Sequence, residues 1–510
     1  MKLNSKKYML IGILIIQNIF YLFITLINYN SMRGTDYEKY SELLNFFIKN
    51  QTEAVGLESG ISYFWYVSLF FNLFKSPLKY SNDSLEYILT FSIQIANFSL
   101  FMLGLAGIYF LLKKMLHYSL TEIYSLLIVL SLFPPIIGAR MILKPEIMVF
   151  GLIPWLLLFY FEYFQNKRLL PLLLSIPVIS LLMTLKMSIS FMLLITVFVI
   201  FNKKIFQLQF LSINIISLLI FSYLIYENYL INGNYLWQHI APPFYESTAD
   251  FSYIYNINLK ELWNTPYRNS QRDSMIGILL TDTFADYWQR YWFHYDGWGL
   301  KINGNTVSKN YPGNLNIIRL SIAISFTFYL SVIIFLIQEK NKKLFSFGIL
   351  GFLGLLALII NALNLLGTKQ FFDVTKGDPM KTHLFSFILI FTFLYFLIKI
   401  RIHKNFLIFS LFALLLNLFL IMMLSPVGVY EIINTPSLQS RIYHFGPCQF
   451  TLFIDSIFST EFSQCGGSEI LNPKNTYFLK VGNKFFANNF ALIISFLSIL
   501  FYYLKQKTKK

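Results

Sequence analysis

Three apolar runs follow one another between residues 145 and 202: PEIMVFGLIPWLLLFYFEYF (145–164), LLPLLLSIPVISLLMTL (169–185) and SISFMLLITVFVIFN (188–202). Each run approaches the roughly 20 residues that a helix needs to cross a bilayer. Basic pairs, Lys167-Arg168 and Lys203-Lys204, follow the first run and the third. This alternation of apolar runs with short basic connectors predicts a chain that crosses a membrane repeatedly.

The composition of the whole chain also indicates a membrane protein. Of its 510 residues, 56% are hydrophobic, 19% are aromatic and only 13% are charged, and the mean hydropathy is +0.57. Soluble domains carry about 25% charged residues. These values exclude a disordered chain, and they exclude a soluble protein that binds nucleic acid through a basic surface, although 41 Lys and Arg against 25 Asp and Glu give a net charge of +16.

Twelve apolar stretches have about the length of a membrane span, and together they predict an all-α polytopic membrane protein. They cover residues 8–30, 85–112, 118–137, 145–164, 169–185, 188–202, 207–231, 315–337, 344–366, 383–400, 404–424 and 487–504.

Short basic connectors alternate with these spans along the chain. Nineteen of the 41 basic residues lie in seven such connectors, at residues 2–7, 113–114, 167–168, 203–204, 340–343, 399–404 and 505–510. Because Lys and Arg beside a span resist translocation, we expect these connectors and both chain ends to face the cytoplasm. The abundance of Lys, Ile, Asn and Phe is typical of an AT-rich genome and favours a bacterial inner membrane.

The other hydrophilic segments are then expected to be outer loops, at residues 31–84, 138–144, 232–314, 367–382 and 425–486. This division predicts a membrane domain over 1–424, a small outer lid over 425–486, and a last span with a basic tail over 487–510. Cys448 and Cys465 both fall in the lid. On an oxidising side of the membrane they suit a disulfide, with two unrelated thiols as the alternative.

The first outer loop holds the strongest candidate for a catalytic base. Thr35 and Glu38 have the spacing of a capping box, so Asp36 is predicted to be the first residue of a helix along the membrane surface. The helix macrodipole favours an ionised acid at this position, which suits a carboxylate that accepts a proton from a hydroxyl. A plain acid in the first turn of a helix has the same pattern, and the residues alone leave both interpretations open.

Three segments give the chain a resemblance to a known family. Gly34-Thr35-Asp36-Tyr37 with Tyr40 follows the first span, Arg140-Met141-Ile142-Leu143-Lys144-Pro145-Glu146 fills a short outer loop, and TDTFADYW occupies residues 281–288. In these motifs the chain resembles the GT-C type membrane glycosyltransferases, in particular a bacterial aminoarabinose-transferase-like branch, which take sugar from a polyprenyl-phosphate carrier on the outer face. The resemblance implies that Asp36 is the general base. No D-x-D motif is present, and we expect no metal and no cofactor.

The outer loops supply the candidate binding residues. For the phosphate of the donor these are Lys381, Arg140 and Lys144, because a phosphate leaving group needs cations at its level. For the substrates they are Tyr37, Tyr40, Glu146, Asp282, Asp286, Trp288 and Arg290. Each cation also suits a contact with lipid headgroups, and each aromatic residue suits an interface belt. A helix through Asp282 and Asp286 is expected to turn Phe284 toward the membrane.

Three functions remain open at this point. The first is an inverting glycosyltransferase that uses a polyprenyl-phosphate sugar donor and a glycan, lipid or protein acceptor, among membrane lipids and without nucleic acid. The second is a lipid-linked glycan polymerase or ligase, which should depend on Arg-rich outer loops, although only nine of the basic residues are Arg. The third is a transporter or flippase without chemistry; few ionisable residues lie near the middle of the spans, which weakens this interpretation.

Overall fold

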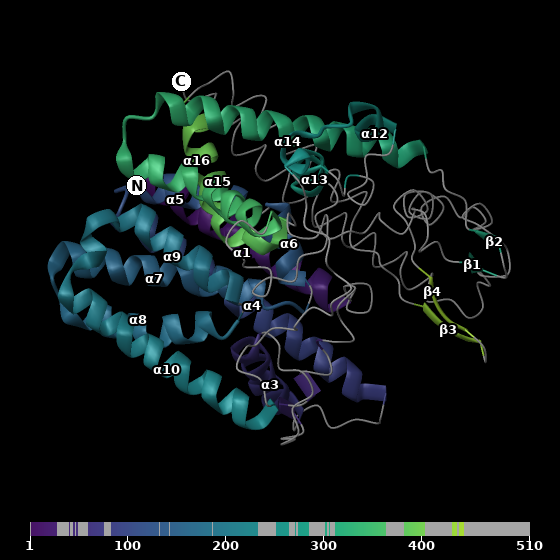
Figure 1. Ribbon diagram of the computed structural model, residues 1–510, viewed down its shortest axis with the longest axis horizontal. Coiled ribbons are helices and arrows are strands. Elements are labelled where there is room, and N and C mark those ends of the chain that lie inside the picture. The colour runs from purple at the N-terminus through teal and green to yellow at the C-terminus, as the bar shows by residue number, and fades with distance from the viewer. Residues whose placement is uncertain are drawn as a thin grey trace.

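A computed structural model describes residues 2–27, 40, 44–45, 47–48, 60–75, 83–131, 133–141, 143–185, 187–232, 251–264, 271, 274–284, 301–302, 305–306, 312–363, 382–402, 431–435 and 438–442. This part of the chain is predominantly helical (Figure 1). The predicted spans 404–424 and 487–504, and most of the predicted lid, lie outside it.

One group of the described helices overlaps predicted spans, each over most of its length. They are α1 (Lys2–Ile27), α4 (Asp83–Lys114), α7 (Glu146–Asn166), α8 (Leu169–Met183), α9 (Met187–Phe201), α10 (Leu208–Asn232), α14 (Pro312–Gln338), α15 (Lys342–Ala362) and α16 (Thr382–Ile402). The other described helices are α3 (Ile61–Lys75), α5 (Leu120–Leu130), α6 (Pro134–Met141), η2 (Asn202–Phe206), α11 (Ser252–Tyr255), α12 (Leu259–Asn264) and α13 (Met275–Asp282).

Two short antiparallel hairpins complete the described elements. Strand β1 (Lys301–Ile302) pairs with β2 (Asn305–Thr306), and β3 (Glu431–Thr435) pairs with β4 (Leu438–Ile442). The second hairpin falls within the predicted lid at residues 425–486, and its register pairs Glu431 with Ile442.

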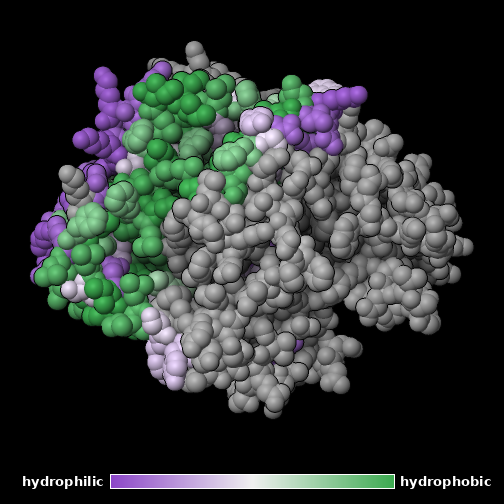
Figure 2. Space-filling view, viewed as in Figure 1, coloured by the Kyte–Doolittle hydropathy of each residue, from purple (hydrophilic) through white to green (hydrophobic). Residues whose placement is uncertain are grey.

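The helices have the apolar character of a membrane protein. Three segments within the described residues are long and apolar enough to cross a bilayer, at Phe91–Lys114, Glu146–Asn166 and Lys342–Ile360. Seven shorter apolar helices accompany them, at Tyr8–Ile19, Leu120–Leu130, Leu169–Met183, Met192–Phe201, Leu208–Ile220, Ile322–Gln338 and Ser386–Ile400. Figure 2 displays the resulting hydrophobic surface over the described helices. The total of twelve spans and the GT-C architecture stay predictions.

The predicted third span, 118–137, is wrong as a single helix. Helix α5 ends at Leu130, and α6 begins at Pro134. Proline has no backbone N–H to donate and disfavours a helical conformation of the residue before it, whereas it fits the first position of a new helix. The Pro134-Pro135 pair therefore divides this segment into two helices, and the second of them, α6, contains Arg140.

Two glycines let the central helices α4 and α7 approach each other closely. A Cβ atom added to Gly104 of α4 would lie 2.5 Å from the Phe150 ring of α7, and one added to Gly151 of α7 would lie 2.9 Å from the Leu100 carbonyl oxygen of α4. Since lipid offers little hydrophobic drive for helix association, close backbone approach of this kind is a main source of stability.

Helix α10 lies at the edge of the bundle beside α8 (Figure 1). Two tyrosines of α7 reach it: the Tyr160 hydroxyl donates to Asn214 Oδ1 at 2.7 Å, and the Tyr163 hydroxyl donates to Gln209 Oε1 at 2.9 Å. Most of its other described side chains are exposed and apolar, whereas Phe210 packs against Tyr160 and Phe164 of α7. The contacts of its described residues therefore hold the helix from one side.

Side-chain contacts join several predicted cytoplasmic connectors at one end of the bundle, which we call the basic end. Lys114 forms an ion pair with Glu162, and Lys343 Nζ donates to the Met115 carbonyl oxygen at 3.2 Å. Lys167 Nζ donates to Gln207 Oε1 at 2.8 Å. The connectors around α4–α5, α7–α8, η2–α10 and α14–α15 thus lie together, as strict alternation requires. Which side of a membrane this end faces stays a prediction.

Candidate functional site

A buried polar cluster lies where α1, α3, α4 and α6 meet. The Tyr63 hydroxyl of α3 donates to Asn97 Oδ1 of α4 at 2.7 Å. Asn97 Nδ2 donates in turn to the carbonyl oxygen of Arg140 at 3.1 Å. The Arg140 guanidinium then reaches Asn18 of α1. We call these four residues the Asn97 cluster, and it links four elements through one chain of hydrogen bonds.

Arg140 occupies the centre of this cluster. Its Nη1 donates to Asn18 Oδ1 at 3.0 Å and its Nη2 donates to the Asn18 carbonyl oxygen at 2.9 Å. The guanidinium carbon lies 4.5 Å from the centre of the Phe101 ring, within the range of a cation–π contact. Planar geometry lets an arginine bind two acceptors on one residue at once, so this side chain clamps α6 to α1.

The segment after Arg140 buries two more charged side chains. Exposed fractions are 1% for Arg140, 7% for Lys144 and 2% for Glu146. A Cβ atom at Gly60, which precedes α3, would lie 3.4 Å from Pro145 Cβ, so α3 packs against this segment. Burial of charge is costly unless the charge is paired or used, and such residues in membrane proteins commonly mark functional sites.

Tyr63 shares its electrostatic environment with three of the predicted site residues. Burial, above all, raises the pKa of the Tyr63 phenol, and the hydrogen bond with Asn97 partly offsets this. The Glu146 carboxylate raises that pKa further, the backbone of Lys144 lowers it, and Tyr40 raises it. The phenol therefore stays protonated, and its proton is available to the Asn97 oxygen at every physiological pH.

The structure brings together the predicted residues Tyr40, Arg140, Lys144 and Glu146. Tyr40 is buried, and its ring centre lies 5.5 Å from that of Phe64, the neighbour of Tyr63 on α3. This contact places Tyr40, which belongs to the predicted first outer loop, beside the Asn97 cluster. Tyr40, from the predicted first outer loop, therefore lies near the segment that carries Lys144 and Glu146.

Most other predicted site residues lie outside the described part of the chain. These are Asp36, Tyr37, Asp286, Trp288, Arg290, Lys381, Cys448 and Cys465. The backbone of Asp282 ends α13, but its side chain is not among the described ones. Their roles stay predictions.

The segment that contains Asp282 differs from the sequence prediction at Phe284. Ser274 caps α13 by accepting from the Gly277 N–H at 2.9 Å. Phe284 is buried, with ring centres 5.9 Å from Phe133 and 5.6 Å from Phe328. The expectation that Phe284 faces the membrane is wrong, because an aromatic pocket from α14 and the α5–α6 junction receives it instead.

Two residues of the cluster, and one neighbour, were missed from the sequence. Asn18 and its neighbour Gln17 fall within the first apolar run, and Asn97 falls within the second. Gln17 Nε2 donates to Ser131 Oγ at 2.7 Å, so it joins α1 to the end of α5. Amide side chains inside apolar runs were the available signal, since a polar group in a span needs a partner within the protein.

The described residues contain no group of three or more His, Cys, Asp or Glu side chains that could hold a metal ion. Comparison with known proteins adds no identification: no protein-family model matches this chain, and no curated protein and no solved structure matches it.

Proposed function

We propose that the protein is a membrane glycosyltransferase that moves a sugar from a polyprenyl-phosphate donor to an acceptor hydroxyl at the outer face. The observation that carries the proposal is the burial of Arg140, Lys144 and Glu146 beside Tyr40 at one end of apolar helices. Cations at the mouth of a membrane domain suit the phosphate of a lipid carrier, and a neighbouring carboxylate and phenol suit the hydroxyls of a sugar.

The proposed reaction is a single inverting displacement. Asp36 accepts the proton of the acceptor hydroxyl, the hydroxyl oxygen attacks the anomeric carbon, and the bond from that carbon to the phosphate oxygen breaks. The polyprenyl phosphate leaves with the bonding electron pair, and Lys144 and Lys381 stabilise its charge.

Within this proposal Arg140 has mainly a positioning role. Its guanidinium already binds Asn18 through two N–H groups, and its carbonyl oxygen accepts from Asn97. These bonds hold the backbone that leads to Lys144 and Glu146. A site whose charged groups are fixed before substrate binds needs less reorganisation during the reaction.

A transfer assay tests the proposal. Purified protein receives a radiolabelled polyprenyl-phosphate sugar and a membrane extract as acceptor source, and wild type is compared with Asp36→Asn. Loss of a general base should lower transfer about 100-fold or more. Glu42→Gln is the matched control, because Glu42 is a second acid of the same predicted helix, six residues after Asp36 and beyond the first turn, and its loss should leave transfer near the wild-type rate.

Two results would contradict the proposal. Equal transfer by Asp36→Asn and wild type would show that Asp36 is not the base. If neither the wild type nor the variants transfer sugar, while the labelled lipid crosses the bilayer of vesicles that contain the wild type, the protein is a flippase.

A further inference from the structure

The acidic side chains at the basic end are already used within the protein. Glu122 caps α5, where it accepts from the Ser119 N–H and hydroxyl at 2.8 and 2.7 Å. Glu162 binds Lys114 and accepts from Asn166, and Glu339 lies 2.6 Å from Lys399 Nζ. Among the described residues at this end, no acid remains for the other exposed cations.

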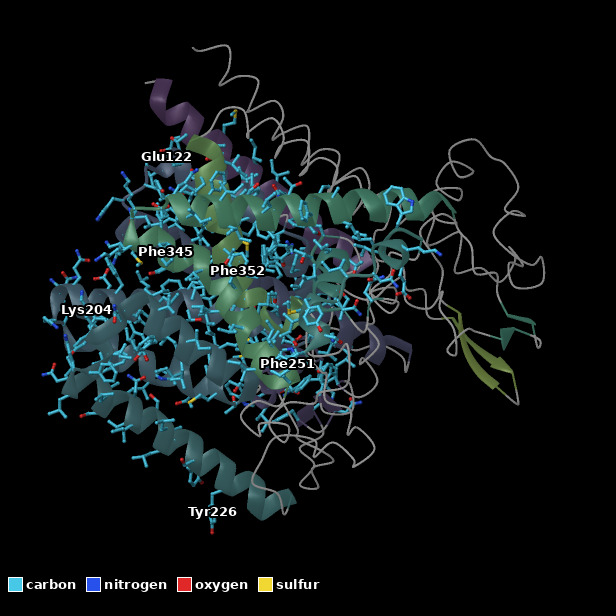
Figure 3. All side chains as sticks on the ribbon, turned by 45° about the horizontal axis from the view of Figure 1, so that its top comes forward. Glu122, Lys204, Tyr226, Phe251, Phe345 and Phe352 are labelled. Carbon is cyan, nitrogen blue, oxygen red and sulfur yellow. The ribbon has the colours of Figure 1, made fainter. Side chains whose placement is uncertain are left out.

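Two of those cations flank one corner of the bundle. Arg168 precedes α8 and Lys204 lies in η2, and both side chains are exposed. The bond from Lys167 Nζ to Gln207 Oε1 ties the two segments together. We call this region the η2 corner; Lys204 lies at the outer edge of the helices in Figure 3.

Strongly exposed apolar side chains adjoin these two cations. Their exposed fractions are 50% for Leu169, 66% for Leu170, 66% for Phe206 and 80% for Leu208. Such residues next to water would be unfavourable, whereas lipid acyl chains cover them at no cost. The η2 corner therefore presents cations and an apolar surface side by side, as at the boundary between headgroups and acyl chains.

We propose that the η2 corner binds an anionic membrane phospholipid, with Arg168 and Lys204 on its headgroup phosphate and with its acyl chains along Leu170, Phe206 and Leu208. Charge complementarity favours an anionic lipid over a zwitterionic one, because a headgroup with net negative charge gains from both cations. The apolar flank favours a lipid over free phosphate. This site is separate from the Asn97 cluster and does not depend on the proposed transferase activity.

The test is a lipid titration on the full-length protein in zwitterionic detergent. Phosphatidylglycerol and phosphatidylcholine are titrated separately, and bound lipid is counted by native mass spectrometry. The double variant R168Q/K204Q should weaken phosphatidylglycerol binding about 30-fold, at about fivefold per cation near a headgroup surface. Phosphatidylcholine binding should stay unchanged.

The matched control is K75Q/K260Q, which removes the same charge from two other exposed lysines, at the end of α3 and in α12. We expect less than a twofold change from it. The proposal is overturned if R168Q/K204Q binds phosphatidylglycerol as wild type does, or if the control loses as much affinity. Should the double variant fold poorly, the single variant K204Q must still weaken binding about fivefold.

Discussion

Replacing Arg140 with Gln tests whether this arginine holds helices together. The change removes two hydrogen bonds to Asn18, at 3.0 and 2.9 Å, and the ring contact with Phe101 at 4.5 Å. Bonds from a charged donor contribute about 1.5–3 kcal/mol each in soluble proteins, but bonds between membrane helices average about 0.6 kcal/mol. The ring contact adds about 1 kcal/mol. The free energy of unfolding should therefore fall by about 2–4 kcal/mol.

The assay is reversible unfolding in mixed micelles as the fraction of sodium dodecyl sulfate rises, without substrate. Arg168→Gln is the matched control, since Arg168 is exposed and should change stability by less than about 0.5 kcal/mol. A double-mutant cycle with Asn18→Ala should give a coupling energy of about 1 kcal/mol with Arg140→Gln. If Arg140→Gln unfolds as readily as Arg168→Gln does, the clamp contributes nothing and the assignment of a positioning role is wrong.

Three further predictions concern packing, a buried ion pair and topology. Gly104→Ala should lower the free energy of unfolding by about 1–3 kcal/mol because the new methyl group would meet the backbone and ring of α7, whereas Gly12→Ala should be neutral because no atom lies within 4 Å of a Cβ there. Glu339→Gln should lower it by about 2 kcal/mol, since Lys399 is largely buried and loses its counter-ion, and adding Lys399→Met should restore part of the loss; equal stability of all three chains would refute the pair's role. In a chain without its two native cysteines, a cysteine placed in loop 232–314 should react with an impermeant maleimide from outside intact cells, and labelling only after lysis would reverse the predicted orientation.

The helix positions could be predicted from the sequence because long apolar runs leave little choice. The predicted span 145–164 became α7 at Glu146–Asn166, and 207–231 became α10 at Leu208–Asn232. In lipid a chain must satisfy its backbone groups internally, and a helix does so within one segment. Within these two runs, hydropathy therefore gives both the type of element and its approximate ends.

Breaks within apolar runs required a different signal. The Pro134-Pro135 pair divides α5 from α6, yet the hydropathy of residues 118–137 continues across it. The break comes from the backbone geometry of proline and not from a change in hydropathy. A hydropathy pattern therefore cannot predict it.

The candidate site was predictable in its charged residues and not in its amide residues. Arg140, Lys144 and Glu146 stand out because they are charged residues in and beside a short predicted outer loop, whereas the amides of Asn18 and Asn97 inside apolar runs indicate only that each needs a partner and not which one. Their importance depends on which helices become neighbours, and one chain's periodicity does not encode that. The prediction that Phe284 faces the membrane was wrong for the same reason, because the aromatic residues around it come from distant segments.

The one-sided attachment of α10 has a consequence for how this helix is oriented. Helix α10 is apolar nearly all round, and lipid does not favour one rotation of such a helix about its long axis over another. Specific contacts with the protein must therefore set this rotation. The Tyr160–Asn214 and Tyr163–Gln209 bonds supply two such partners, and the buried Phe210 ring, 4.7 Å from the ring centre of Tyr160 and 5.1 Å from that of Phe164, supplies a third contact on the same side. Loss of both hydrogen bonds would leave the rotation of α10 to apolar packing of this kind, which holds a helix at one angle less strictly than a directional bond does.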